Sequence, residues 1–327
     1  MTNNRSDSYC GKRVLVTGGL GFIGINLCAR LLDLGATVTV LDNFLPPRVS
    51  PALDQVMAGL TLVIADIRDK ERVEQAVQGQ EVVFNLAGKS GAADSNKFPL
   101  DDLDINCRGH LTILEACRVC SPGVTIVFPS SRLVYGKPIY LPVDERHPVV
   151  PQSVYAAHKL AVENYHLIYG ELYGFKSTVL RISNPYGPFQ AGGSRAYGIV
   201  NNFIQSAVTG RQIALFGNGS QRRDYLYVGD LVEVLLLAAS EEAARGKIYN
   251  IGDGQGTSLL ELAEMAVAVA GHGDIVQVPW PEEYRAIETG DYLSDIGLVQ
   301  RELGWSPTVP ILEGVVRTVE YYRQCIR

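Results

Sequence analysis

The chain has 327 residues, of which 46% are hydrophobic, so it can bury a large core as one big domain or two unequal ones. A formal net charge of −6 argues against a nucleic-acid partner, because binding phosphate backbones needs a basic face. No apolar run reaches the roughly 18 residues of a membrane span, and the polar first residues lack a secretory signal, so we expect a cytoplasmic protein without a membrane partner.

The first informative segment is a glycine-rich turn between a strand and a helix. Residues 17–24 read Thr-Gly-Gly-Leu-Gly-Phe-Ile-Gly, with an apolar run before them and helical spacing of apolar residues after them. Gly18 permits a sharp turn, Gly21 lets the backbone approach a pyrophosphate, and Gly24 lets helix and strand pack closely. An anion then binds the free N–H groups at the helix start. The segment predicts a dinucleotide site; the alternative is a glycine-rich turn without a ligand.

The second expected strand, Thr37–Asp42, ends in an acidic residue about 20 residues after the glycines. The Asp42 carboxylate can accept hydrogen bonds from both ribose hydroxyls and would repel a 2′-phosphate. We therefore expect NAD, and not NADP, as the cofactor.

Short apolar runs, each followed by a helical stretch, continue through the first half of the chain. Runs without polar alternation are typical of parallel strands that helices cover on both faces. We therefore predict an α/β fold with a doubly wound parallel sheet and right-handed crossovers. The expected strands are Arg13–Thr17, Thr37–Asp42, Leu60–Asp66, Val82–Asn85, Val124–Ser130 and Thr178–Ile182.

Small or polar residues stand where the first five of these strands end. Because parallel sheets bind ligands beyond the carboxyl ends of their strands, we expect these side chains along one edge of the sheet. They are Thr17, Asp42, Asp66, Asn85 and the pair Ser130 and Ser131.

Six cysteines are scattered along the chain, and Cys117 and Cys120 have the spacing C-x-x-C. No second cysteine pair or histidine cluster accompanies them in the sequence. We expect buried or idle thiols and no metal site.

A tyrosine and a lysine lie four residues apart in a helix expected over Val154–Tyr169. Tyr155 and Lys159 therefore share one helix face. An ammonium group and a nicotinamide cation beside a phenol both favour the phenolate. Ser131 ends the preceding strand, and its hydroxyl can bind a substrate oxygen held between serine and tyrosine. The three residues predict proton transfer at an alcohol while a hydride passes to NAD; alone, the tyrosine–lysine spacing is a common surface pair.

The character of the sequence changes after Asn184, where glycine and proline cluster as far as Gly193. We predict an NAD-binding domain of residues 1–184 with a return segment at 226–252, and a smaller mixed α/β substrate-binding cap in the rest of 185–327. Beyond the cluster we expect helices near Gly198–Thr209 and over Ser258–Ala270, Asp295–Leu303 and Ile311–Cys325, and a strand over Gly246–Ile251.

These motifs together resemble the extended short-chain dehydrogenase/reductase superfamily, in its nucleotide-sugar epimerase/dehydratase branch. The resemblance runs from about Lys12 to the last helix and implies a Rossmann fold. The segments that carry it are residues 17–24, Asp42, Asp66-Ile67, Asn85–Gly88, Asn106–Gly109, Ser130–Gly136, Tyr155 with Lys159, Leu180–Gly187, Gly217–Asp224 and Leu303–Trp305.

The resemblance also implies roles for the catalytic residues. Tyr155 is the expected general acid and base, Lys159 holds the nicotinamide ribose and tunes the tyrosine, and Ser131 binds the reacting oxygen. For the cofactor the remaining expected contacts are Gly18, Gly21, Phe22, Ile23, Gly24, Asp42, Asn43, Asp66, Ile67, Leu86, Ala87, Gly88 and Ser130.

The expected substrate site is less closely defined. Asn184 and Arg223 are implied to contact the diphosphate, and an arginine fork suits phosphate oxygens. The alternative for Arg223 is a surface ion pair. Lys89 and Arg132 are further candidates for substrate contact, with a plain solvated loop as the alternative for Lys89.

The chain departs from the family pattern at two places. Family 4,6-dehydratases usually carry Asp-Glu after the catalytic hydroxyl residue, where Arg132 and Leu133 stand here, and neither can eliminate water. Glu288 takes a place where many relatives have an arginine for the pyrophosphate, and Arg285 can compensate. We expect Glu163 to be a charge on a helix face.

We therefore expect an NAD-dependent nucleotide-sugar 4-epimerase that oxidises C4 of an NDP-hexose, first of all a UDP-sugar, and returns the hydride to the other face. An alternative is an unusual dehydratase, acting for example on a UDP-hexose or UDP-N-acetylhexosamine, or a 4-dehydrogenase. The dehydratase would use a residue such as Cys120, Glu288 or Lys89. A third interpretation is a non-catalytic NAD-binding regulator.

Helices expected over Leu103–Val119 and Val154–Tyr169 pair across a two-fold axis in relatives, so the resemblance implies a homodimer.

Overall fold

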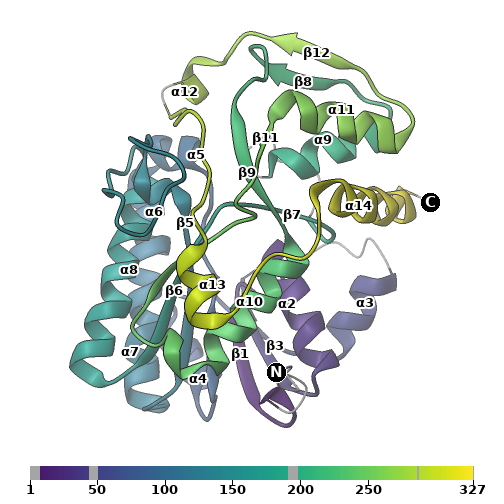
Figure 1. Ribbon diagram of the computed structural model, residues 1–327. Coiled ribbons are helices and arrows are strands. Elements are labelled where there is room, and N and C mark those ends of the chain that lie inside the picture. The colour runs from purple at the N-terminus through teal and green to yellow at the C-terminus, as the bar shows by residue number, and fades with distance from the viewer. Residues whose placement is uncertain (1–7, 44–50, 191–197, 286, 327) are drawn as a thin grey trace.

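A seven-stranded parallel sheet is the largest element of the computed structural model, which describes residues 8–43, 51–190, 198–285 and 287–326 (Figure 1). Its order, β10-β6-β5-β4-β1-β2-β3, runs outward in two directions from β1 and β4. This arrangement confirms the predicted doubly wound fold. The strands are β1 (Arg13–Thr17), β2 (Thr37–Asp42), β3 (Thr61–Ile64), β4 (Val82–Asn85), β5 (Thr125–Ser131), β6 (Lys176–Ile182) and β10 (Ile248–Ile251).

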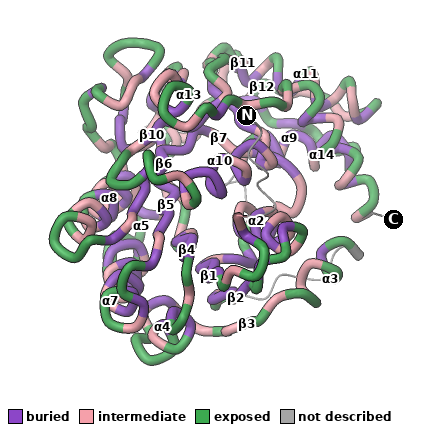
Figure 2. Tube along the Cα trace, turned by 60° about the horizontal axis from the view of Figure 1, so that its bottom comes forward, coloured by how far each residue is buried: buried purple, intermediate pink, exposed green. Residues whose placement is uncertain are grey.

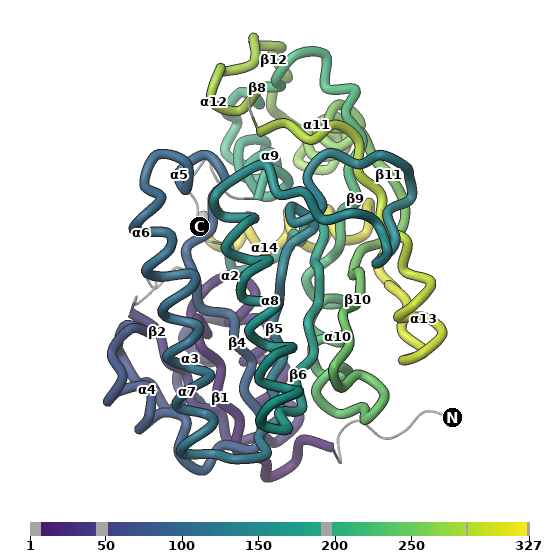
Figure 3. Tube along the Cα trace, turned by 90° about the vertical axis from the view of Figure 1, so that its left-hand side faces the viewer, coloured from purple at the N-terminus to yellow at the C-terminus, as the bar shows by residue number. Residues whose placement is uncertain are grey.

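Helices cover both faces of this sheet because each buried strand is apolar on both sides. Side chains of a strand alternate between the two faces. Val14 and Val16 of β1 pack into the cluster under one set of helices, whereas Leu15 packs into the cluster under the other. One set is α2 (Phe22–Asp33), α3 (Pro51–Ala58) and α10 (Val228–Ser240), and the other is α4 (Lys70–Val77), α7 (His110–Cys120) and α8 (Val154–Tyr173). Figure 3 shows α7 and α8 side by side along the sheet.

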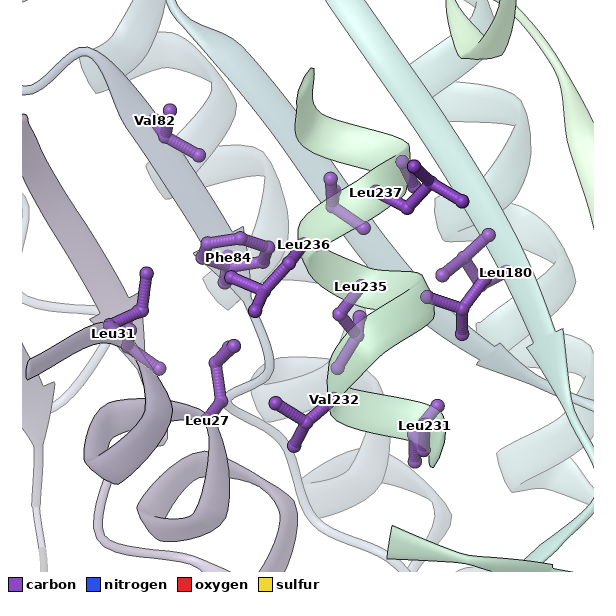
Figure 4. Close-up of a cluster of buried hydrophobic side chains, with 14 of the residues drawn as sticks. Leu27, Leu31, Val82, Phe84, Leu180, Leu231, Val232, Leu235, Leu236 and Leu237 are labelled. Atoms are coloured by element: carbon purple, nitrogen blue, oxygen red, sulfur yellow. The ribbon is translucent and has the colours of Figure 1, made fainter. Parts of the chain in front are cut away.

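The hydrophobic core beneath α10 joins this helix to α2 and to the sheet, and Figure 4 shows side chains of this core. Leucines of α10 pack against Leu27 and Leu31 of α2 and against Phe84 of β4, all of them buried. Burying one such side chain contributes about 1.5–3 kcal/mol. Figure 2 shows the same pattern across the fold, with buried chain at the sheet and exposed chain at its outer turns.

The single helix expected over Leu103–Val119 is divided into three pieces. The structure has α6 (Pro99–Leu103), a π-helical segment η1 (Asp104–Gly109) and α7. The Asn106 amide of η1 accepts from the Lys89 N–H at 3.0 Å and donates to the Lys89 carbonyl at 2.8 Å. The wider turn places this amide against the loop after β4, and π-helical turns are frequent at functional sites.

The rest of the chain forms two small sheets and a second helical cluster. One sheet has the order β11-β9-β7 and the other pairs β12 with β8. Buried Phe203, Leu262 and Val319 belong to the core of this part. Its elements are β7 (Asn184–Tyr186), α9 (Ile199–Val208), β8 (Ile213–Phe216), β9 (Arg222–Tyr227), β11 (Gly256–Ser258), α11 (Leu259–Ala270), β12 (Ile275–Val278), α12 (Glu282–Arg285) and α14 (Ile311–Ile326).

Short elements complete the chain: α5 (Ala92–Lys97), η2 (Arg132–Tyr135), η3 (Glu242–Ala244) and α13 (Gly297–Leu303). Residues 191–193 of the expected glycine–proline cluster lie outside the described residues. Among the helices that the structure describes, none is long and apolar enough to cross a membrane.

Close packing of α2 on the glycine turn gives a stability prediction. A Cβ at Gly24 would lie 2.3 Å from the Gly18 carbonyl oxygen, and backbone cannot move aside cheaply. Gly24→Ala should therefore lower the free energy of unfolding in urea by at least about 1–3 kcal/mol. The matched control is Gly170→Ala within α8, where the new Cβ would lie 3.5 Å from the nearest heavy atom, a carbonyl oxygen. It should gain up to about 1 kcal/mol from helix propensity. Equal effects of the two changes would contradict the packing argument.

Candidate active site

A cavity of about 820 Å³ opens beyond the carboxyl ends of β1, β4 and β5, where the strand order reverses. The sequence-predicted site residues line it, with the exception of Arg223. The structure thus brings together Gly18, Gly21, Phe22, Ile23, Gly24, Asp42, Asn43, Asp66, Ile67, Leu86, Ala87, Gly88, Lys89, Ser130, Ser131, Arg132, Tyr155, Lys159 and Asn184.

The glycine turn forms one end of this cavity. Gly18 has φ +66°, and its N–H donates to the Leu41 carbonyl at 2.8 Å. A Cβ there would lie 2.7 Å from the Ala87 Cα, so only glycine fits. Gly21 precedes α2 without a capping side chain, which leaves the helix start able to bind an anion.

Two aspartates lie beside the turn. The Asp42 carboxylate accepts from the Leu20 N–H at 3.0 Å and so links the end of β2 to the glycine turn. Asp66 accepts from the Arg68 guanidinium at 2.8 Å. These hydrogen bonds are the main reason that the pKa of Asp66 falls to about 2, so this carboxylate is ionised at neutral pH.

The candidate catalytic side chains meet where β5 ends and α8 begins. The Lys159 amine is buried, donates to the Pro129 carbonyl at 3.1 Å and lies 5.8 Å from the centre of the Tyr155 ring. The Tyr155 N–H donates to the Ser95 hydroxyl at 2.9 Å, which fixes the first turn of α8. Burial lowers the pKa of Lys159 to about 8, and the charge of Glu163 partly offsets this effect.

Glu163 is not the exposed helix-face charge that the sequence suggested. Its carboxylate is buried and accepts from the Ser130 hydroxyl at 2.5 Å and from the Arg181 guanidinium at 2.7–3.1 Å. Arg181 also donates to the Tyr135 hydroxyl at 3.0 Å. The signal that could have revealed Glu163 is its spacing, four residues after Lys159 and therefore on the same helix face.

Two arginines lie at the other end of the site. Arg132 donates to the Asn184 side-chain oxygen at 3.3 Å and lines the cavity. Arg223 is also buried, and it donates to the Glu288 carboxylate and to the Gly290 carbonyl. The structure thus shows Arg223 in a buried ion pair and away from the cavity lining, and a diphosphate would have to displace Glu288 to reach it. Glu288, which stands where many relatives have an arginine for the pyrophosphate, is the ion-pair partner of Arg223.

The three candidates for an additional acid or base occupy different places. Cys120 and Glu288 do not line the cavity. Lys89 does line it, but its amine forms an ion pair with Asp101 at 2.5 Å. Leu133 also lines the cavity and has no ionisable group.

Comparisons with known proteins identify the family. A model of the NAD dependent epimerase/dehydratase family matches residues 14–252. The chain belongs to this family. It is 34% identical over 311 residues to a putative UDP-glucose 4-epimerase of Methanocaldococcus jannaschii, covering 95% of this chain and 98% of the relative. It is 30% identical to a UDP-N-acetyl-alpha-D-glucosaminuronate decarboxylase of Bacillus cytotoxicus, covering 96% and 98%.

Solved structures agree with this assignment. The crystal structure of the UDP-glucose 4-epimerase of Thermus thermophilus in complex with NAD matches with a TM-score of 0.85 at 34% identity, covering 95% of this chain and 99% of the other. The glycine turn, the helix start and Asp42 at the cavity fit the same cofactor. The protein is an NAD-dependent nucleotide-sugar enzyme of the epimerase/dehydratase type.

The buried Lys159 gives a prediction about stability and pH. The pKa of Lys159 is about 8 in the folded protein, below the value near 10.4 in an unfolded chain. The buried charge therefore lowers the free energy of unfolding, and this effect is complete below pH 8. It becomes smaller as the pH rises from 8 to 10, because the amine is then neutral in the folded protein. Lys159→Met should raise the free energy of unfolding by about 1–3 kcal/mol at pH 7, with a smaller difference at pH 10, while it abolishes activity. Urea unfolding without added cofactor measures both differences.

The control for this prediction is Lys70→Met, because the Lys70 side chain is 77% exposed. This variant should differ little from the wild type at either pH. A Lys159→Met protein that is less stable at pH 7, or whose difference does not change with pH, would contradict the assigned cause.

Proposed function

We propose that the protein is an NAD-dependent nucleotide-sugar 4-epimerase acting on an NDP-hexose, with UDP-sugars as the first class to test. The observation that carries this proposal is the set of Ser131, Tyr155 and Lys159 at one cavity beside the glycine turn, with Leu133 where dehydratases of the family have an acid. An epimerase needs no further acid or base, because the 4-keto sugar only has to rotate before the hydride returns.

The side chains divide the work of proton transfer. Ser131 and Tyr155 hold the C4 oxygen, and the Tyr155 phenolate takes the hydroxyl proton. The positive charge of Lys159 favours the phenolate and the buried amine remains close to the ring. NAD, when bound, supplies the acceptor for the C4 hydride. Tyr155 returns the proton to the oxygen after the sugar has turned.

The test is Tyr155→Phe, which keeps the ring and removes the proton-transferring hydroxyl. We expect kcat for C4 inversion of UDP-glucose, UDP-N-acetylglucosamine or their uronic acids to fall by about 10²–10⁴. Tyr140→Phe is the matched control, because Tyr140 is exposed and its hydroxyl bonds to Asp144 away from the cavity. A Tyr155→Phe protein as active as the wild type would contradict the mechanism and favour a regulator.

Mass spectrometry of the products separates the proposal from its enzymatic alternatives. An unchanged mass with an inverted C4 supports the epimerase. A loss of one water identifies a dehydratase, and a net loss of two hydrogens identifies a 4-dehydrogenase; either result would overturn the 4-epimerase proposal.

We further propose a cytoplasmic homodimer. We also propose that residues 1–184 and 226–252 form the cofactor-binding part and that the rest of 185–327 forms the substrate-binding part. Exposed apolar side chains on neighbouring helices support the dimer, namely Leu100 and Leu103 of α6, Val119 of α7, and Ile168, Leu172 and Tyr173 of α8. Figure 3 shows how the backbones of these three helices lie next to one another. Such faces are typical of self-complementary two-fold interfaces.

Sedimentation analysis tests the dimer. The wild type should sediment as a dimer and Leu172→Glu as a monomer, because a charge in the apolar interface is costly. Leu312→Glu on α14 is the control, since Leu312 is exposed to a similar extent on a different face. A monomeric wild type would refute the proposal.

A further inference from the structure

Arg132 presents a buried positive charge to the cavity. It is 9% exposed and directly follows Ser131, the residue proposed to hold the C4 oxygen. Its guanidinium donates to two neutral partners, the Asn184 side-chain oxygen and the Thr289 hydroxyl, both at 3.3 Å. A guanidinium has five N–H donors, so these two long hydrogen bonds leave much of its capacity unused. Among the described residues, no carboxylate lies within ion-pair distance of it.

The local charges do not balance without an anion. Arg132 lies near Arg223, and the carboxylate of Glu288 is bound to Arg223, so two guanidinium groups face one acid. Burial and the charge of Arg223 lower the pKa of Arg132 to about 10, which still leaves it protonated at neutral pH. A buried charge without a partner is costly, and an anion from outside the chain would remove that cost.

The surroundings hold the Arg132 guanidinium in a fixed orientation. It lies over the ring of Tyr292, 5.0 Å from the ring centre, in a cation–π arrangement. Asn184 donates its amide N–H to the Asp224 carbonyl at 2.8 Å, which turns its oxygen towards Arg132. The donor group is therefore positioned before a ligand arrives, and this reduces the entropy that binding loses.

The place of Arg132 in the chain indicates which substrate group it meets. If Ser131 binds the C4 oxygen, the adjoining residue faces a substituent on a ring carbon next to C4. The diphosphate, attached to C1 across the ring from C4, is the competing anion, because Arg132 bonds to Asn184, which the resemblance places at the diphosphate. The binding experiment below separates these two anions. The carbon attached to C5, beside C4, is C6, which is a carboxylate in a hexuronic acid. The planar guanidinium matches a carboxylate with two parallel hydrogen bonds.

We propose that Arg132 is a specificity-determining residue that binds the C6 carboxylate of a nucleotide-linked hexuronic acid. This inference rests on the proposed function, because it places Ser131 at the C4 oxygen. It narrows the substrate class from nucleotide hexoses to nucleotide hexuronates.

Calorimetry with the NAD-loaded Tyr155→Phe protein measures binding apart from turnover. The probes are glucuronate and glucose linked to uridine or thymidine diphosphate, and each diphosphate alone. The parent should bind one glucuronate probe at least 10-fold more tightly than the matching glucose probe. Adding Arg132→Gln should weaken glucuronate binding about 10- to 100-fold and leave the nucleoside diphosphate unaffected. Arg132→Lys, which keeps the charge but not the fork, should restore part of the preference.

Arg222→Gln is the matched control, because it removes the same charge from an arginine outside the cavity lining. It should keep the glucuronate preference. Three results would overturn the inference: no preference for glucuronate with either nucleotide, an equal loss for the diphosphate alone, or a preference for UDP-N-acetylmuramate, whose carboxylate is attached through C3. The two proposals can fail separately. If glucuronate binding depends on Arg132 but the enzyme with Tyr155 intact inverts no C4 centre, the epimerase reaction is contradicted and the carboxylate site is retained.

Discussion

The geometry of the site depends on the buried ion pair between Glu163 and Arg181, which joins α8 to β6. Removing a carboxylate and a guanidinium from water is costly, and here the cost is offset because both groups are engaged on several sides. The pair fixes the rotation of α8, and with it Tyr155 and Lys159, relative to the sheet. The same carboxylate holds Ser130, the neighbour of Ser131. The residues proposed for proton transfer, which come from a helix and a strand, are thereby kept in one arrangement.

The parts of the fold that the sequence predicted are those encoded by local patterns. The bounds of β1, β2 and β4 match the prediction, because each is a short apolar run ended by a turn or a polar residue. Long-range partners were not predictable in this way. Arg223 meets Glu288 across 65 residues, and Asn106 reaches Lys89 through a π-helical turn that no periodicity signals. Glu163 looked like a helix-face charge because the sequence does not show which face a neighbouring strand covers.

The cavity combines two chemically different ends. Near the glycine turn, positive φ and close backbone contacts leave helix N–H groups for a pyrophosphate, and the carboxyl groups of Asp42 and Asp66 lie beside them. At the other end the notable side chains are cationic, and Leu133 stands where elimination would need an acid. The family comparisons establish the NAD-dependent nucleotide-sugar chemistry. We expect the side chains at this second end of the cavity to determine which reaction occurs and which sugar binds.

The contact between Arg223 and Glu288 has a consequence for how strongly any phosphate can be held there. An incoming anion can bind the Arg223 guanidinium only if the Glu288 carboxylate moves out into solvent, so one ion pair replaces another. The net affinity is then well below that of an unoccupied arginine. The tethered carboxylate also competes with a bound anion for the guanidinium, which favours faster release of the anion. In the proposed epimerase, substrate and product carry the same nucleoside diphosphate, so this exchange of counter-ions would let both bind and dissociate at one site.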